Sequence, residues 1–269
     1  MKIISKFKEE ETLVDVSGKK VYRSGEIMPI DDCIVLEHLI EVNINTVPTF
    51  QLVCSKSDLP ELVLGRLLTE RIIDSVAEVD QIYICEYGNR AEVLLKDQYR
   101  ADFSRRSVEK VNSCCTSNKI LNAYFEKNTR PENVVPIKVN SAEIFSLCDL
   151  FNEDSPNHKK TFGTHSCYIC DTSSEADILM AEDLGRHNAL DKAIGKALIS
   201  NFNLKTCILF SSGRLPLDMI MKVVNSHIPI IVSKAVPTAT TIEVAKEFNL
   251  GLVCSAYPDS YIVFNDTFS

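Results

Sequence analysis

The stretch CILFSSGRLPLDMIMKVV, residues 207–224, carries the pattern that decides the fold. Its apolar start, Cys207 to Phe210, is typical of a buried strand, and Pro216 to Val224 has the spacing of a helix with Asp218 and Lys222 as its polar stripe. The same alternation fills the second half of the chain, with strands expected at 165–170, 178–181, 228–232 and 252–255 and helices at 186–199 and 242–248. Short apolar strands between helices predict a sheet covered on both faces.

The first half of the chain predicts a smaller α+β unit. Asp58 precedes an apolar run, as an N-cap residue does, and Glu61 follows three residues later, so we expect a helix from there to about Ile73. Gly88-Asn89 is expected to form the turn of a hairpin. The other expected elements are strands at 39–45, 49–54, 81–85 and 91–95 and helices at 118–127 and 141–151. The first forty residues alternate loosely, as edge strands or an arm do.

Together these elements predict an α/β protein of two domains. The boundary should fall near residues 125–140, with an N-terminal α+β domain over residues 1–130 and a larger α/β domain over residues 131–269. The net charge of −8 argues against nucleic-acid binding, because a duplex is bound through a basic face. No apolar run resembles a signal peptide or a membrane span, so we expect a cytoplasmic protein without membrane contact.

Loops at the ends of two expected strands have the composition of a ligand crevice. Ser212, Gly213 and Arg214 follow one buried strand and precede a helix, where backbone N–H groups and an arginine can bind an anion. Pro237 and Thr238 follow the next strand, and Thr238 is expected to cap a helix. Neighbouring strands of such a sheet end side by side, which places the two loops together. The alternative is a pair of ordinary turns.

The segment AEDLGRHNALDK, residues 181–192, is the densest polar stretch in the chain. His187 and Asp191 lie four residues apart on the expected helix, and Asn188 and Lys192 form the neighbouring row. Glu182 and Asp183 stand where the preceding strand ends. Polar side chains so concentrated beside apolar ones favour a binding site, and the alternative is a structural network of ion pairs.

The ten cysteines should be free thiols in a reducing compartment, and most should be small buried hydrophobes. Cys167 and Cys170 would project to opposite faces of a strand, which argues against a shared zinc ion. Cys114 and Cys115 differ, because the basic residues around them favour the nucleophilic thiolate over the thiol. These basic neighbours are Arg105, Arg106, Lys110 and Lys119.

Several of these motifs resemble those of the FdhD family of sulfurtransferases. Residues 182–192 resemble its E-D-V-G-R-H-N-A-V-D-K signature with only Val-to-Leu changes. Ser212-Gly-Arg214 with Met219 and Lys222 resembles its S-G-R…M…K segment. Residues 235–238 resemble its S-A-P-T stretch, and Thr161-Phe-Gly-Thr-His165 resembles its T-G-G-x-H. The matches cover most of residues 161–255 in the same order.

The resemblance implies a sulfur carrier for formate dehydrogenase. Members take persulfide sulfur from a cysteine desulfurase and pass it, through a Cys-x-x-Cys loop, to a transiently bound molybdenum bis-guanine-dinucleotide cofactor. It further implies a cytidine deaminase-like, three-layer C-terminal domain without the zinc set, a homodimer, and the formate dehydrogenase catalytic subunit as partner. The cofactor-binding residues it implies are His165, Glu182, Asp183, Gly185, Arg186, His187, Asn188, Asp191, Lys192, Ser212, Gly213, Arg214, Pro237 and Thr238, and no metal ligand is implied.

The chain departs from the family pattern at the cysteine loop. Cys114 aligns with the first motif cysteine, whereas Ser117 replaces the second; adjacent Cys115 is an addition. One thiolate suffices to carry a persulfide, so one hypothesis is a sulfur carrier that uses Cys114. A second hypothesis is a non-catalytic protein that binds the guanine-dinucleotide cofactor or chaperones an apo-enzyme. A third is a zinc-dependent deaminase on the same scaffold.

Overall fold

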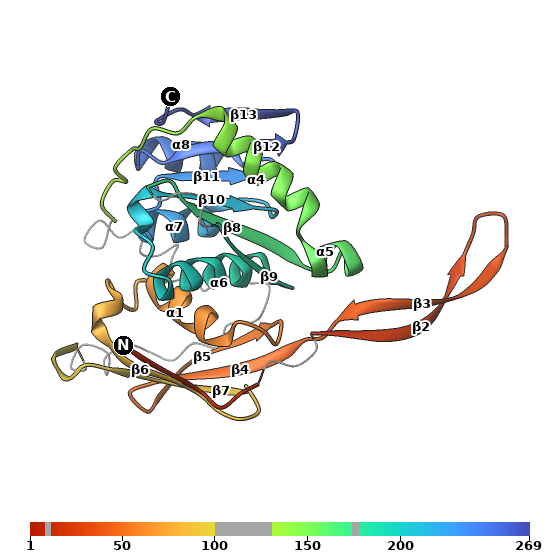
Figure 1. Ribbon diagram of the computed structural model, residues 1–269, viewed down its shortest axis with the longest axis horizontal. Helices are drawn as coiled ribbons and strands as arrows, with labels where there is room; N and C mark the ends of the chain where they lie inside the picture. Colours follow the sequence, from red (N-terminus) through yellow and green to blue (C-terminus); the bar gives the residue numbers. More distant parts are fainter. Residues whose placement is uncertain (9–11, 100–130, 174–177) are drawn as a thin grey trace.

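The computed structural model describes residues 1–8, 12–99, 131–173 and 178–269. Two sheets lie one above the other with helices between them (Figure 1). One helix of the N-terminal half, α1 (Leu59–Thr69), and one of the C-terminal half, α6 (Arg186–Ile199), meet in the middle layer. The expected helix 118–127 and the cysteines at 114 and 115 lie outside the described residues.

The N-terminal sheet has the strand order β1-β6-β7-β4-β5. Its members are β1 (Lys2–Ser5), β4 (His38–Ile44), β5 (Val47–Cys54), β6 (Val79–Ile84) and β7 (Arg90–Leu95). The expected hairpin around Gly88-Asn89 is confirmed as β6 and β7. Short 3-10 turns at Val76–Glu78 and Asp97–Tyr99 flank this hairpin.

The helix α1 begins where predicted, with Asp58 at its N-cap position, but it lacks the expected side-chain cap and ends earlier than expected. Asp58 has a left-handed backbone with φ 50° and caps no N–H group with its side chain; it pairs with Lys196 at 2.9 Å instead. The helix ends at Thr69, before the expected Ile73, because Arg71 is left-handed with φ 52° and the chain turns back there. Both corrections come from tertiary contacts and turn geometry that an apolar run does not specify.

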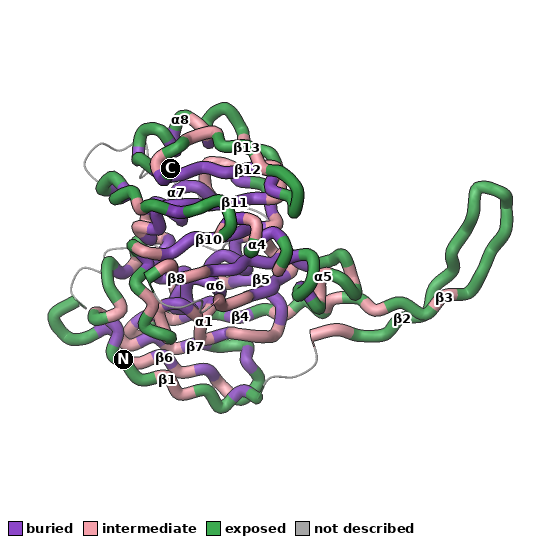
Figure 2. Tube along the Cα trace, turned by 45° about the horizontal axis from the view of Figure 1, so that its top comes forward, coloured by how far each residue is buried: buried purple, intermediate pink, exposed green. Residues whose placement is uncertain are grey.

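The strands β2 (Leu13–Val21) and β3 (Ile27–Val35) form a separate two-stranded antiparallel sheet. This hairpin is the arm expected among the first forty residues, and it extends far from the body of the molecule (Figures 1 and 2). Most of its residues are exposed, whereas the strands of the body are largely buried (Figure 2).

The C-terminal sheet has the order β13-β12-β11-β10-β8-β9. Its strands are β8 (His165–Asp171), β9 (Ile178–Asp183), β10 (Cys207–Ser211), β11 (Ile230–Ser233), β12 (Gly251–Tyr257) and β13 (Ser260–Asn265). β10, β11 and β12 are parallel, and β8 is antiparallel to both β9 and β10. The carboxyl ends of β9 to β12 therefore share one edge with the start of β8. β13 was not expected from the sequence.

Helices cover both faces of this sheet, as the alternating pattern predicted. The helices α6, α7 (Leu217–Asn225) and α8 (Ala239–Glu247) pack on one face, and α4 (Ser141–Glu153) packs on the other. A short helix, α5 (Pro156–Thr161), follows α4, and a 3-10 turn at Leu204–Thr206 precedes β10. Likeness to a cytidine deaminase stays a prediction.

The two halves share one apolar core, which runs from the N-terminal sheet through α1 and α6 to the C-terminal sheet. Two glycines allow the backbones of α1 and α6 to touch. A Cβ atom on Gly65 would lie 1.8 Å from the carbonyl oxygen of Asp191, and one on Gly195 would lie 1.9 Å from that of Glu61. No side chain fits at either position. The domain boundary at 130/131 stays a prediction, and the core continues across it.

Candidate functional site: an anion-binding edge of the C-terminal sheet

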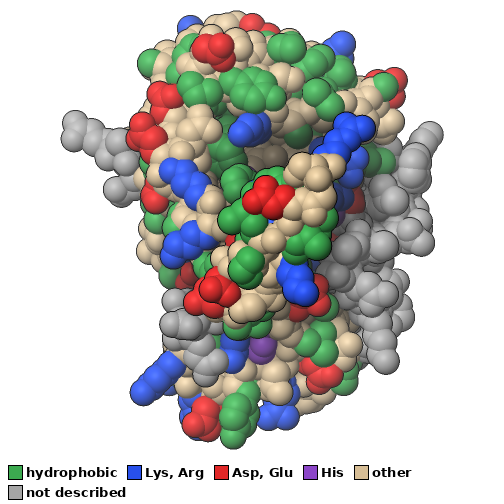
Figure 3. Space-filling model, turned by 90° about the vertical axis from the view of Figure 1, so that its right-hand side faces the viewer, with side chains coloured by type: hydrophobic (Ala, Val, Ile, Leu, Met, Phe, Trp, Pro, Cys, Tyr) green, Lys and Arg blue, Asp and Glu red, His purple; other side chains and the backbone are tan. Residues whose placement is uncertain are grey.

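The strand ends bring the predicted crevice residues together at one edge of the sheet. His165 at the start of β8 pairs in register with Asp183 at the end of β9, and Ser211 at the end of β10 pairs with Cys167. The helices α6, α7 and α8 all begin at this edge. In Figure 1 the edge faces the same side as the arm, and Figure 3 views that side, where basic and acidic side chains are interspersed.

Gly213 lies at the centre of this edge and has little free space around it. A Cβ atom there would be 2.9 Å from the Cβ of Arg186 and 3.5 Å from Nδ1 of His165. Its N–H group donates to Oγ of Ser211 at 3.2 Å, and its carbonyl accepts from Oγ of Ser233 at 2.9 Å. These bonds fix a turn whose backbone lies directly against two nitrogen-bearing side chains.

The electrostatics of this edge favour an anion. Gly185, the N-cap of α6, offers no capping side chain, and the first turn of α6 contains no acid, so the positive end of the helix dipole faces this edge. The carboxylate of Asp183, at the end of β9, accepts the N–H group of Gly185 at 2.9 Å. Nε of Arg186 is buried and has no hydrogen-bond partner among the described residues. Burial, and then the charge of Arg186, lower the pKa of His165, which keeps this imidazole neutral at pH 7.

The remaining loop residues form the rim of the edge. Leu215 and Pro237 make a parallel bridge that joins the two loops. Oγ1 of Thr238 accepts the N–H group of Thr241 at 3.1 Å, which confirms the predicted cap of α8. Arg214 is exposed and leaves its guanidinium accessible to solvent. Ser212 accepts the N–H group of Ser166 at 3.0 Å and lies 3.5 Å from His165.

His187 points from α6 to the first turn of α7. Its Nε2 lies 3.1 Å from Oδ2 of Asp218, and both side chains are largely buried. Burial opposes the ionisation of Asp218, but the hydrogen bond and charge of His187 and the N–H group of Met219 outweigh it, and the pKa of Asp218 is lowered. The predicted polar stripe of α7 is therefore not solvated at Asp218.

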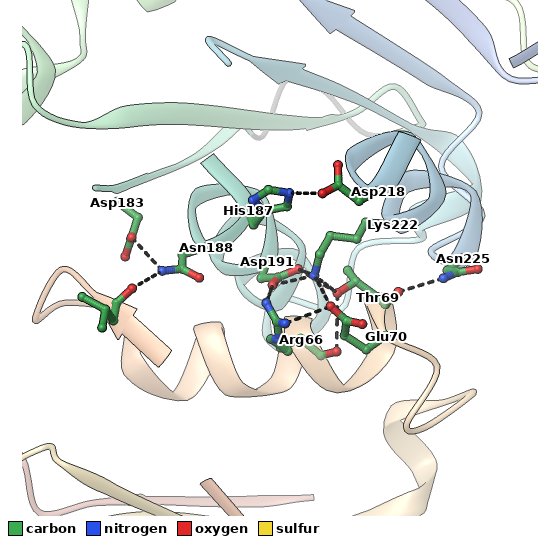
Figure 4. A network of polar contacts seen from close by, with 11 residues as sticks. Arg66, Thr69, Glu70, Asp183, His187, Asn188, Asp191, Asp218, Lys222 and Asn225 are labelled. Atoms are coloured by element: carbon green, nitrogen blue, oxygen red, sulfur yellow. Dashed lines mark hydrogen bonds and ion pairs between the residues drawn. The ribbon is translucent and has the colours of Figure 1, made fainter. Parts of the chain in front are cut away.

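A second set of signature residues lies in a buried network that joins α6 to the end of β5. Nζ of Lys192 pairs with Oδ2 of Asp183 at 2.7 Å, and neither side chain is exposed. The same Oδ2 accepts the N–H group of Ser55 at 2.9 Å, and Asn188 donates to the carbonyl of Val53 at 2.8 Å. Asn188 also donates to Oδ1 of Asp183 at 3.0 Å (Figure 4). These side chains connect the two halves of the chain.

A third set forms a buried ionic cluster around Lys222, on the side of α6 that faces α1 and α7. Nζ of Lys222 lies 2.8 Å from both carboxylate oxygens of Asp191 and 3.1 Å from Oε1 of Glu70 (Figure 4). Arg66 contacts Glu70 at 3.0 Å and Asp191 at 3.5 Å, and Thr69 donates to Asp191 at 2.7 Å. The expectation that Lys222 lies on a solvent-facing polar stripe of its helix is wrong, because its side chain has no exposed area.

Glu182 has a local structural role. Its carboxylate accepts the N–H groups of Asn157 at 2.9 Å and His158 at 3.0 Å, in the first turn of α5, and the hydroxyl of Ser166 at 3.1 Å. It therefore fixes α5 beside the start of β8. The acid is held by protein donors rather than directed to the crevice.

The predicted site residues thus divide into two groups. Those at the edge are His165, Gly185, Arg186, Ser212, Gly213, Arg214, Pro237 and Thr238, with His187 just behind them. Those engaged in protein networks are Glu182, Asp183, Asn188, Asp191 and Lys192, for which the alternative of a structural ion-pair network fits the geometry. Ligand contacts of both groups stay predictions.

Sequence reasoning missed the partners of these networks on the N-terminal half. Arg66 and Glu70 were not singled out, although two opposite charges four residues apart in an apolar helix are a signal for a buried ion pair. Ser55 was not among the predicted site residues either. Here its hydroxyl accepts the N–H group of Leu184 at 3.1 Å, so it joins β5 to the start of the signature.

Three of the buried cysteines in the described ranges are poor candidates for a nucleophile. Burial raises the pKa of Cys54, Cys167 and Cys254 to about 12, so these thiols stay protonated. Cys167 and Cys170 pack into cores on opposite faces of the sheet, as predicted. In the described ranges, no three His, Cys, Asp or Glu side chains are grouped so as to hold a metal ion. Cys114, Cys115 and Ser117 lie outside those ranges.

No helix in the described part of the chain is long and apolar enough to span a membrane. The fold is an α/β arrangement of two large sheets and a two-stranded arm, with a candidate anion-binding turn at the edge of the six-stranded sheet.

Comparison with known proteins gives the family. The model of the FdhD/NarQ family matches residues 35–268, and the chain belongs to this family. Sulfur carrier protein FdhD of Bacillus subtilis (strain 168) is 29% identical over 245 residues, covering 90% of this chain and 92% of that protein. Its namesake from Listeria innocua is 29% identical over 244 residues, covering 88% and 92%.

A solved structure confirms the fold. The crystal structure of a protein from Desulfotalea psychrophila, described as a candidate formate dehydrogenase accessory protein, superposes with a TM-score of 0.76. The identity is 22%, and the superposition covers 95% of this chain and 98% of that one. At this identity the likeness shows that the two chains share the arrangement of their sheets and helices.

Proposed function

We propose that this protein carries sulfur during the maturation of a formate dehydrogenase, and that Cys114 is the carrier thiol. Membership of the FdhD/NarQ family and the names of the similar sulfur carrier proteins support this role. The basic sequence around Cys114 supports the choice of thiol, because nearby cations stabilise the thiolate. The raised pKa values of Cys54, Cys167 and Cys254 favour it further.

The transfer itself is an exchange between sulfur atoms. The Cys114 thiolate attacks the outer sulfur of a persulfide on a cysteine desulfurase. A new S–S bond forms on Cys114 as the old S–S bond breaks, and the desulfurase cysteine leaves as a thiolate. The step needs no external oxidant or reductant, and one cysteine is enough to perform it. The replacement of the second motif cysteine by Ser117 does not prevent it.

We propose further that the edge at Gly213 binds the guanine-nucleotide portion of the molybdenum cofactor, which is cargo for this protein. The observation that carries this proposal is the orphaned donor: Nε of Arg186, buried without a partner in the described residues, beside a turn with no space for a Cβ atom. The N-terminal turn of α6 and Arg186 would hold phosphate oxygens. Neutral His165 can donate a hydrogen bond to the ligand or accept one from it, and it does not repel the neighbouring guanidinium of Arg186.

Calorimetry with GDP and with inorganic pyrophosphate tests the edge. Arg186→Gln removes the cation and should weaken both ligands by about tenfold or more, as expected for a lost charged hydrogen bond of about 1.5–3 kcal/mol. Arg90→Gln is the matched control, since Arg90 is exposed on β7 of the other sheet. Equal affinities of the Arg186 variant and the wild type would refute the placement of the nucleotide.

Ser117 favours a second candidate, a cofactor-binding chaperone that no longer transfers sulfur. Cys114→Ala separates the two. Incubation with a cysteine desulfurase and cysteine should add the mass of one sulfur atom to the wild-type loop peptide and none to the variant. A cell lacking this gene should regain formate dehydrogenase activity with the wild type and not with Cys114→Ala. Full activity with the variant, together with unchanged GDP binding, would establish the chaperone instead.

A further inference from the structure

Phe162, at the end of α5, is the most exposed large apolar side chain among the described residues, and its backbone is left-handed. The side chain is 80% exposed, and φ is 52°. A left-handed backbone suits glycine and is an outlier for a bulky residue, so it persists only where the surrounding structure holds it. The motif T-G-G-x-H of the family has glycine at this position. This chain therefore keeps a turn suited to glycine and adds an aromatic ring to it.

Hydrogen bonds fix the backbone around this ring. The N–H group of Phe162 donates to the carbonyl of His158 at 2.7 Å, and that of Gly163 donates to Oγ1 of Thr161 at 3.0 Å. The carboxylate of Glu182 accepts two N–H groups in the first turn of α5 and so ties this helix to the start of β8. The ring is therefore presented to solvent from a backbone that is held at both ends of α5.

Behind Phe162 lies a series of rings that leads toward the end of β11. The rings of His158 and Phe162 meet edge to face with their centroids 5.8 Å apart, and His158 lies 5.5 Å from Phe151. Nδ1 of His158 donates to the carbonyl of Thr164 at 2.6 Å, because a carbonyl only accepts, and this bond sets the orientation of the imidazole. Nζ of Lys234 lies 4.8 Å from the centre of the Phe151 ring. The series thus ends at a cation.

This series and the turn at Gly213 belong to the same edge of the sheet. The N–H group of Lys234 donates to the carbonyl of Ser211 at 3.2 Å, and Oγ of Ser211 accepts the N–H group of Gly213 at 3.2 Å. Three residue steps separate Phe162 from His165, so their Cα atoms lie at most about 11 Å apart. A nucleotide with its phosphates at the turn can therefore place its base beside the exposed ring.

The surroundings of the ring suit a phosphorylated planar ligand better than a protein surface. Lys159, Lys160 and Gly163, which are close to Phe162 in the chain, are exposed, and they are charged or lack a side chain. A protein interface needs a contiguous apolar patch, whereas a single phenyl ring is enough to stack on a heteroaromatic base. The ammonium of half-buried Lys234 adds a positive charge for phosphate.

We propose that Phe162 stacks on the base of the nucleotide whose phosphates bind at the Gly213 turn, and that it is a specificity-determining residue of this site. It favours phosphates that carry a planar ring over phosphates that carry none. The inference rests on the proposed nucleotide edge and adds a contact that a glycine at this position does not supply.

Calorimetry with GDP and with inorganic pyrophosphate, which has no base, tests the proposal. Phe162→Gly removes the ring and suits the left-handed backbone, so the variant should fold as the wild type does. Its affinity for GDP should fall about fivefold or more, as expected for a lost base stack, while its affinity for pyrophosphate should not change. Phe162→Tyr should retain the wild-type affinity for GDP. The H8 proton of GDP should resonate further upfield with the wild type than with Phe162→Gly, because a stacked ring shields it.

Tyr22→Gly is the matched control. Tyr22 is 39% exposed and lies between β2 and β3, in the turn of the arm, which extends far from the body (Figure 1). This variant should bind both ligands as the wild type does. Equal GDP affinities of Phe162→Gly and the wild type would overturn the stacking contact and leave the phosphate edge intact. An equal loss for GDP and pyrophosphate would also overturn it, because the ring would then act through the turn. A wild type that binds neither ligand would overturn the nucleotide edge itself, and the stacking contact with it.

Discussion

Lys222→Met would remove the ammonium group that two buried carboxylates share while retaining the length of the side chain. Lys222 lies 2.8 Å from both oxygens of Asp191 and 3.1 Å from Glu70, and the side chains involved are 0–8% exposed. Arg66 would remain the cation for both acids, at 3.0 and 3.5 Å. The variant therefore keeps two negative charges in the interior with one positive charge.

The expected loss of stability follows from this count. Breaking a buried ion pair by removing one partner costs about 3–5 kcal/mol, because the other charge stays desolvated. The whole free energy of unfolding of a domain is about 5–15 kcal/mol. The variant should therefore lose about a fifth or more of its stability at neutral pH. Urea unfolding followed by far-UV circular dichroism measures this loss, since the chain has no Trp.

The loss should shrink in acid. Burial opposes the ionisation of Glu70, but Lys222 and Arg66 outweigh it and hold its pKa below the usual range. A carboxyl of lowered pKa stabilises the fold above its unfolded pKa and loses that contribution as the pH falls through its folded pKa. Without Lys222, burial should raise the pKa of Glu70, so the variant neutralises this acid at a higher pH than the wild type does. Its deficit in stability relative to the wild type should therefore decrease as the pH falls.

Lys196→Met is the control, because Lys196 pairs with Asp58 at 2.9 Å but both side chains are 20–26% exposed. It should cost about 1 kcal/mol or less. The reasoning is refuted if Lys222→Met costs no more than Lys196→Met at neutral pH.

Two further predictions concern packing and thiols. Gly195→Ala would place a methyl group 1.9 Å from the carbonyl oxygen of Glu61, so α1 and α6 must separate. Chemical denaturation should show that the free energy of unfolding falls by about 1–3 kcal/mol or more. A variant as stable as the wild type would contradict the contact. Cys54 and Cys254 should resist an alkylating reagent in the native protein at pH 8 and react after unfolding, because burial raises the pKa of each thiol to about 12. Mass spectrometry of the labelled peptides measures this, and rapid labelling of either cysteine in the native protein would refute it.

Much of the C-terminal sheet follows from local sequence. The run from Cys207 to Val224 gave a strand and a helix because four apolar residues and then a 3.6-residue period leave few other possibilities. The gathering of His165, Ser212 and Gly213 at one edge follows from strand direction. β13 (Ser260–Asn265) was not predicted from the sequence, because this half-buried strand lies at the end of the sheet and pairs with β12 in an irregular register.

The networks could not be predicted from α6 alone. Lys222 looks solvated in its own helix, and only the acids that α6 and α1 bring to it explain its burial. Asp58 has the position of a capping residue, yet its pairing with Lys196 in the other half prevails over the cap. Both errors have one cause. A local pattern considers a charged residue only with its neighbours in sequence and with solvent, whereas its actual partner comes from a distant segment of the chain.

The glycine contact between α1 and α6 bears on how the protein can be dissected. A fragment of residues 131–269 would leave Asp183 and Asp191 without the donors that Ser55, Arg66 and Thr69 supply, and would bare the flank of α6 that carries Gly195. Such a fragment should precipitate or stay unfolded rather than act as an autonomous module. Much of the family signature at residues 182–192 therefore lies in the contact between the two halves of the chain. Only the first turn of α6 remains available to bind the cofactor.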